Sequence, residues 1–154
     1  MTSSVAEWVA GLVPDAVDRV LDLAATWLAW DGTPAMGEGG GRLYTPHKAI
    51  RRVADHLLDH LAEIEALLAG EPTRPDGWHA SYVSSPADFA PFTEQDLNEA
   101  RQRLSRLADL YRIKVQGLDA EAVTRPLVDD RNVRSIVEHV ASSWYAEQVG
   151  SLGR

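Results

Sequence analysis

The sequence predicts an all-α protein built as a four-helix bundle. Four segments repeat apolar residues at helical spacing, their ends carry residues that cap or stop helices, and no stretch alternates convincingly between apolar and polar residues. The chain has 154 residues, of which 45% are hydrophobic. We therefore expect a single domain over residues 1–154, with a core large enough to fold without a disulfide or a structural metal.

The first helix is predicted to start near residue 5, because Ser4 and Glu7 have the spacing of a capping box. Gly11 and Pro14 are expected to interrupt it, so that a second run begins at Pro14. An apolar stripe follows at spacings of three and four, formed by Val17, Val20, Leu21, Ala24, Trp27 and Leu28. Residues 31–34 end this helix, and the glycine-rich residues 37–41 form a loop.

The second helix is predicted to begin after Thr45, an N-cap followed by proline, and to end before Gly70. Residues 71–92 are rich in proline, serine and aspartate, and we expect them to form a long crossover between helices two and three. Such a crossover is long enough to span the end of a bundle or to join two parallel neighbours.

The third helix is predicted to begin after Thr93, which is followed by acidic residues that suit a helix amino terminus, and to end at Gly117. The fourth is predicted to start near Asp130 or Asn132 and to end at Gly150. Four amphipathic helices of this length are typical of a four-helix bundle.

Composition excludes several classes of function. The net charge is −8, from 15 Lys and Arg against 23 Asp and Glu, and this balance argues against a nucleic-acid partner. The chain has no cysteine, which excludes disulfides, thiolate metal sites and a cysteine nucleophile. No apolar run approaches ~18 residues and no secretory signal is visible, so we expect a cytoplasmic protein without a membrane partner.

Histidines lie beside the predicted core on two helices. With the stripe of helix two centred on Leu57, His60 falls about 60° and His56 about 100° from the centre, one turn apart on the same flank, with Glu63 close to that row. With helix four centred on Val140, His139 falls about 100°, Ser143 about 60° and Glu147 about 20° from the centre. Each helix therefore offers polar groups on a row that flanks the core.

These rows are consistent with a divalent-metal site inside the bundle. His60 and His139 are the first two candidate ligands, and a third comes from His56, Glu147 or Glu63. Three protein ligands would leave one open position for water or substrate, as in catalytic sites. The alternative is that the histidines form an ordinary half-buried polar pair, and that the acids are satisfied by neighbouring arginine or tyrosine.

A mainly basic group of side chains lies at the start of helix two. Its members are Tyr44, His47, Lys48, Arg51 and Arg52. Together with free helix-end amides, such a group can bind an anion. It can equally be a solvated patch that pairs with acids elsewhere, and we favour the patch because exposed charge clusters are the commoner case.

Two strings resemble DinB-like proteins. Residues 50–65, IRRVADHLLDHLAEIE, look like the second helix of that family, and residues 135–145, SIVEHVASSWY, look like its last helix. The start of the second helix, TPHKA at 45–49, also resembles an uncharacterised subgroup. The family's name is shared with a DNA polymerase to which this chain shows no resemblance.

The resemblance implies a four-helix bundle with a pocket in which three histidines bind a divalent metal, often zinc or nickel. One ligand comes from helix two, which His60 matches, and two come from an H-x-x-x-H on helix four. His139 matches the first of these, whereas Ser143 stands at the second. Glu147 or His56 could take the missing place.

Better-known relatives are transferases and isomerases that use a small thiol as co-substrate. The resemblance therefore implies a metal-dependent enzyme acting on a small molecule, with any thiol supplied by a co-substrate because the chain has none. The alternative is a metal-free bundle that binds a ligand or a partner without catalysis. Ser143 favours it, because this residue stands where the family has a histidine. We also expect a homodimer, since two-fold dimers are the commonest oligomers.

Overall fold

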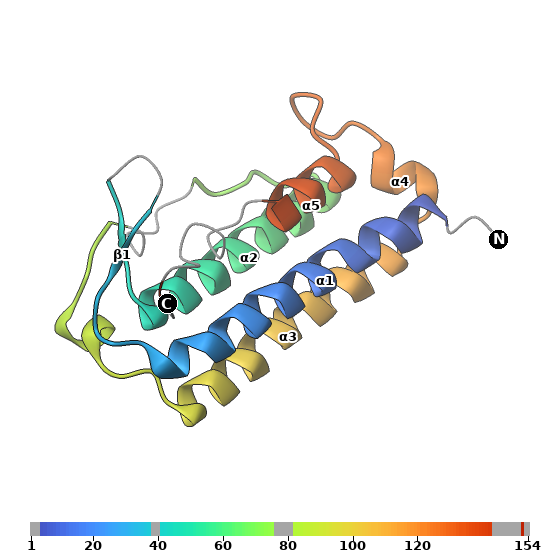
Figure 1. The fold of residues 1–154 in the computed structure, drawn as a ribbon. Helices are drawn as coiled ribbons and strands as arrows, with labels where there is room; N and C mark the ends of the chain where they lie inside the picture. Colours follow the sequence, from blue (N-terminus) through green and yellow to red (C-terminus); the bar gives the residue numbers. More distant parts are fainter. Residues whose placement is uncertain (1–3, 38–40, 76–81, 143–151, 153–154) are drawn as a thin grey trace. The chain divides into compact units, whose positions relative to one another are not determined.

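The computed structural model describes residues 4–37, 41–75, 82–142 and 152. This part of the chain is mostly helical, in agreement with the predicted all-α class (Figure 1). Its elements in chain order are α1 (Val5–Ala25), η1 (Thr26–Ala29), β1 (Ala35–Met36), β2 (Leu43–Tyr44), α2 (Pro46–Ala69), η2 (Pro86–Phe89), α3 (Glu94–Gln116), α4 (Ala120–Thr124) and α5 (Val133–Ser142). None of the helices in these ranges combines the length and the apolar character that crossing a membrane requires.

The chain divides into two compact units, each assembled from three separate stretches. The first unit contains Met1–Val17, His56–Asp76 and Ser105–Ser143, and the second contains Asp18–Asp55, Gly77–Leu104 and Trp144–Arg154. All three histidines named as metal ligands therefore belong to the first unit. The basic residues at the start of α2 belong to the second.

Capping signals placed the helix ends correctly. Ser4 and Glu7 form the predicted capping box: the Ser4 amide donates to the Glu7 carboxylate at 2.9 Å, and the Glu7 amide donates to the Ser4 hydroxyl at 3.2 Å. Asn132 caps α5 by accepting from the Ser135 amide at 2.8 Å. After α2, Gly70 has a φ of 71°, a left-handed conformation that glycine adopts without strain.

The predicted break at Pro14 is wrong, because α1 runs unbroken from Val5 to Ala25. A proline inside a helix removes one backbone hydrogen bond and crowds the preceding turn. Val9, Val13 and Val17 are almost completely buried on either side of it. We infer that burial of this apolar face outweighs the cost of the proline.

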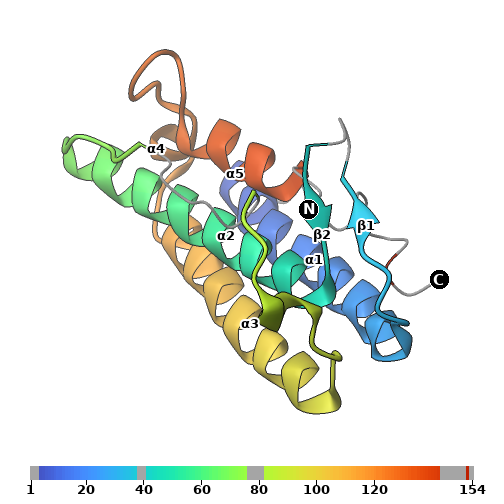
Figure 2. The same ribbon diagram turned by 90° about the vertical axis from the view of Figure 1, so that its left-hand side faces the viewer.

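Four small elements were not predicted. The strands β1 and β2 pair antiparallel, with Ala35 opposite Tyr44 and Met36 opposite Leu43 (Figure 2). Each strand has only two residues, too few to show a period of two in sequence. The helix η2 lies inside the predicted crossover, and α4 packs against α5.

The fourth predicted helix is confirmed in its first half. It begins one residue after the Asn132 cap, and Val133, Ile136, Val137 and Val140 are buried along one face. The predicted continuation to Gly150 lies outside the described residues.

Candidate metal centre

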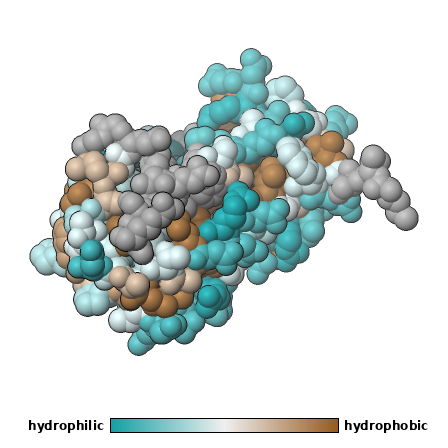
Figure 3. Space-filling model, viewed as in Figure 1, coloured by the Kyte–Doolittle hydropathy of each residue, from teal (hydrophilic) through white to brown (hydrophobic). Residues whose placement is uncertain are grey.

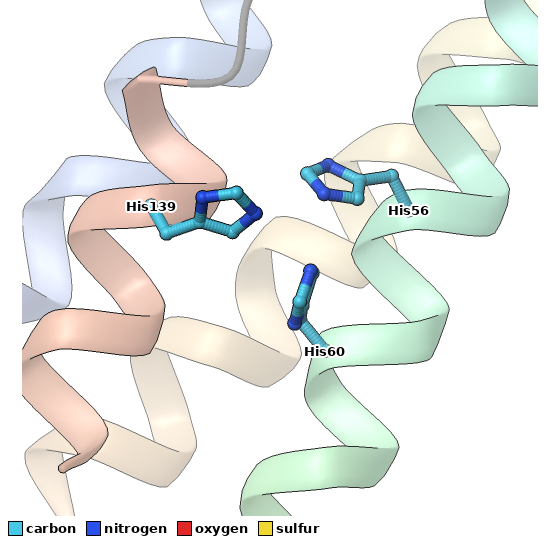
Figure 4. A group of neighbouring side chains, drawn as sticks. All are labelled: His56, His60 and His139. Carbon is cyan, nitrogen blue, oxygen red and sulfur yellow. The ribbon is translucent and has the colours of Figure 1, made fainter. Parts of the chain in front are cut away.

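Three histidines from two helices of the first unit lie together. His56 and His60 stand one turn apart on α2, and their ring centroids are 4.6 Å apart. His139 comes from α5, with its ring centroid 5.3 Å from that of His56 and 4.9 Å from that of His60. Figure 4 shows one ring nitrogen each of His60 and His139 pointing into the space between the rings. One ligand atom from each residue lies within 4.8 Å of the others.

The three side chains differ in exposure. His56 is buried, with 7% of its surface exposed, His60 is half-buried, and His139 is exposed. The cluster is therefore closed on the His56 side and reachable from solvent on the His139 side. Partial burial, together with the neighbouring His60, lowers the pKa of His139 below its usual value, although Glu63 acts in the opposite direction. This shift favours the neutral ring, the form that binds metal.

Glu63 contacts the cluster from outside. Its Oε2 lies 2.6 Å from Nδ1 of His60, and its Oε1 pairs with the guanidinium of Arg131. The Glu63 side chain is 12% exposed. One carboxylate oxygen of Glu63 thus contacts His60, and the other contacts Arg131.

The sequence offers His56, Glu147 and Glu63 as candidates for the third ligand. Among the described residues, His56 is the one that joins His60 and His139 within ligand distance. Glu147 and Ser143 lie outside the described residues.

Arg131 was missed by the sequence analysis. It closes a tight turn in which the Leu127 amide donates to the Arg131 carbonyl at 2.8 Å and the Arg131 amide donates to the Val128 carbonyl at 2.9 Å. The two central residues, Asp129 and Asp130, have φ values of 50° and 61°. Both angles suit a hairpin turn of type I′, and aspartate tolerates them better than most residues. The segment appears as the mostly hydrophilic projection at the top of Figure 3.

Tyr111 supports α2 beside the cluster. Its hydroxyl donates to the Leu57 carbonyl at 2.7 Å, on the residue that directly follows His56. Burial raises the pKa of this tyrosine far above its usual range, so it remains a donor. Tyr111 is not singled out by the sequence analysis; the available signal is that a tyrosine hydroxyl buried in a core needs a hydrogen-bond partner.

The basic group at the start of α2 is built differently from the predicted solvated patch. Lys48 is completely buried and donates to the Ser84 hydroxyl at 2.9 Å. Arg51 donates to both carboxylate oxygens of Asp88, at 2.5 and 3.2 Å, and Asp88 is 2% exposed. Arg52 is also buried, at 7%. The patch interpretation is therefore wrong for Lys48 and Arg52.

The crossover supplies the partners of Lys48 and Arg51. Ser84 and Asp88 both belong to it, and their separation from α2 in sequence hid the pairing. Burial tends to raise the pKa of Asp88, but hydrogen bonds from Arg51 and from the Ser85 amide outweigh it and lower the pKa below its usual value. Burial also lowers the pKa of Lys48.

The remaining two members also contact their own unit. His47 Nε2 lies 3.1 Å from the Pro91 carbonyl, and its ring meets Phe92 edge to face. Tyr44 is completely buried in β2.

Comparisons of the chain with protein-family models, with curated proteins and with solved structures each found no match.

Proposed function

We propose that this chain is a DinB-like four-helix bundle that binds one divalent metal ion, zinc or nickel, through His56, His60 and His139. The observation that carries the proposal is the meeting of three imidazoles from two helices within ligand distance. The mostly helical fold supports it. So does the placement of His60 on α2 and His139 on α5, the helices from which the resemblance draws its ligands.

The donor set fits such an ion. Imidazole nitrogens suit zinc and nickel, and a cysteine-free chain offers no thiolate to compete with them. Nitrogens bound to tetrahedral zinc at ~2.1 Å lie about 3.4 Å apart, so atoms now within 4.8 Å need only modest side-chain rotation to meet one ion.

The ligand set departs from the one implied by the family in a definite way. The family takes one histidine from helix two and two from helix four, whereas here α2 supplies two and α5 supplies one. His56 precedes His60 by four residues, which places both on one side of α2. We infer that His56 takes the role of the family histidine that is replaced here by Ser143.

The proposed chemistry is a metal-dependent reaction of a small molecule. When bound, the ion supplies a Lewis acid that polarises a substrate or lowers the pKa of a water or thiol. The chain's own residues hold three nitrogens in place and keep the His139 side open to solvent. A thiol would have to arrive on a co-substrate, because the chain has no cysteine.

Metal analysis of protein prepared without a histidine tag tests the proposal. We expect close to one equivalent of bound metal, or saturation at one equivalent on addition of zinc or nickel, since a real site binds tightly. His47→Ala is the matched control, because His47 belongs to the other unit and contacts the Pro91 carbonyl. Less than about a tenth of an equivalent, unchanged by added zinc or nickel, would overturn the proposal.

The second candidate function is a metal-free bundle that binds a ligand or a partner without catalysis. It is favoured by Ser143, which stands where the family has a histidine. Ser143→His restores the H-x-x-x-H spacing. Tight zinc binding in this variant, combined with none in the natural protein, supports the second candidate. One equivalent in the natural protein counts against it.

A further inference from the structure

Glu63 and Arg131 form a chain of contacts that ends on the histidine cluster. Glu63 lies three residues after His60 on α2, and its Oε2 approaches Nδ1 of that histidine at 2.6 Å. Arg131, 68 residues away in sequence, binds the other oxygen. Both oxygens of the Glu63 carboxylate therefore have partners within the first unit.

The contact with Glu63 decides the proton position on His60. An ionised carboxylate only accepts hydrogen bonds, so the nitrogen that faces it must carry a hydrogen. A neutral imidazole has one N–H and one lone pair. Nδ1 is therefore the protonated nitrogen, and Nε2 keeps its lone pair. Figure 4 shows a ring nitrogen of His60 pointing toward His56 and His139.

Arg131 restrains the carboxylate itself. Its pairing with Oε1 opposes rotation of Glu63 toward solvent, and the backbone hydrogen bonds of the turn hold the Arg131 backbone in place. The Glu63 side chain is 12% exposed and the Arg131 side chain 45%, so the carboxylate is largely shielded from solvent while its arginine partner is not.

We propose that Glu63, held by Arg131, is a positioning residue that fixes His60 in the Nδ1–H tautomer and presents its Nε2 lone pair to the histidine cluster. In metal sites, a carboxylate on the outer nitrogen of a histidine orients the ring and makes it a stronger ligand. The role in metal binding rests on the proposed function, whereas the tautomer is a property of the metal-free protein as well.

Nitrogen-15 NMR of histidine-labelled, metal-free protein above pH ~8, where imidazole is neutral, tests the tautomer directly. We expect His60 as the Nδ1–H form in the natural protein and a shift toward the Nε2–H form in Glu63→Gln, whose amide can donate as well as accept. Glu65→Gln is the matched control, because Glu65 lies on the same helix but pairs with Lys114. A natural His60 in the Nε2–H form would overturn the inference whether or not metal binds.

Zinc affinity supplies the second measurement. We expect Glu63→Gln to bind zinc about 10–100-fold more weakly than the natural protein, and Glu65→Gln to bind it equally well. Unfolding curves of all variants establish that each is folded. Equal zinc affinity in Glu63→Gln and the natural protein contradicts the positioning role. An Nδ1–H His60 in a protein that binds no metal upholds the tautomer and overturns the proposed function alone.

Discussion

Two groups of residues that both draw on α2 differ in their electrostatics: one pairs positive charges with partners, and the other gathers nitrogen lone pairs. The first is the basic network, formed by Lys48, Arg51, Ser84 and Asp88. The second is the histidine cluster, formed by His56, His60 and His139. In the basic network, Lys48 and Arg51 of α2 donate hydrogen bonds to a hydroxyl and a carboxylate of the crossover. In the histidine cluster, three imidazole rings converge from α2 and α5, and the carboxylate of Glu63 contacts Nδ1 of His60.

On the proposed function, the difference separates a structural role from a ligand-binding one. Removing one partner of a buried charge pair destabilises a fold, because it leaves an uncompensated charge. Nitrogen lone pairs that point to one place can instead bind a positive metal ion. Substitutions in the network should therefore change stability and spare metal binding, and substitutions in the cluster should do the reverse.

The largest effect is expected for His139→Ala. Zinc binds to structural sites with about 10–16 kcal/mol, so losing one of three ligands should weaken binding about 1,000-fold, or about 4 kcal/mol. Stability should hardly change in the metal-free protein, because the side chain is exposed. Competition with a coloured chelator measures the affinity. A loss of less than tenfold would remove His139 from the ligand set.

Asp88→Asn is expected to destabilise the protein by about 2–3 kcal/mol, because it removes the buried carboxylate that Arg51 binds and whose charge also attracts Lys48. Zinc affinity should stay within threefold of the natural value. Urea unfolding measures the first quantity. Asp109→Asn serves as the control, since Asp109 is 61% exposed in its pair with Arg112 and should cost less than about 0.5 kcal/mol. Weakened zinc binding in Asp88→Asn would erase the division between the two regions.

The pH dependence of stability should carry the signature of Asp88. Its pKa in the folded protein lies below the ordinary value of 3.8, so its contribution is complete above that pH and is lost as the pH falls through the folded pKa. The natural protein should therefore lose more stability than Asp88→Asn as the solution is acidified below pH ~4. Urea unfolding at a series of pH values measures both. Parallel curves for the two proteins would show that Asp88 has no depressed pKa.

Tyr111→Phe should give the smallest effect, about 1 kcal/mol of stability, because it removes one buried hydrogen bond to the Leu57 carbonyl without changing the shape of the side chain. A weakening of zinc binding by a few fold would show that this bond also steadies α2 between His56 and His60. Thermal unfolding and chelator competition report the two quantities. An unchanged unfolding free energy would mean that water replaces the hydroxyl.

Local signals predicted most of the fold. Ser4, Gly70 and Asn132 act within a few residues of themselves, and each marked a helix end correctly. Pro14 misled the prediction because its local cost is overcome by burial on both sides, which depends on tertiary packing. Strands β1 and β2 were too short to show a pattern.

The site could be predicted in part for the same reason. Helical spacing alone placed His56 and His60 on one flank of α2 and His139 beside the core on the last helix. Choosing His56 as the third ligand required the packing of α5 against α2. The pairs Arg51–Asp88 and Glu63–Arg131, separated by 37 and 68 residues, have no sequence signature at all.

The graded exposure of the three histidines has a kinetic consequence. On the proposed function, an ion arriving from solvent meets His139 first, then His60, and His56 last. The bond to His139 is also the first that a chelator in solution can attack, because His139 is the exposed member of the cluster. Exchange of metal with the surroundings would then be controlled from α5, and an ion would be captured in steps.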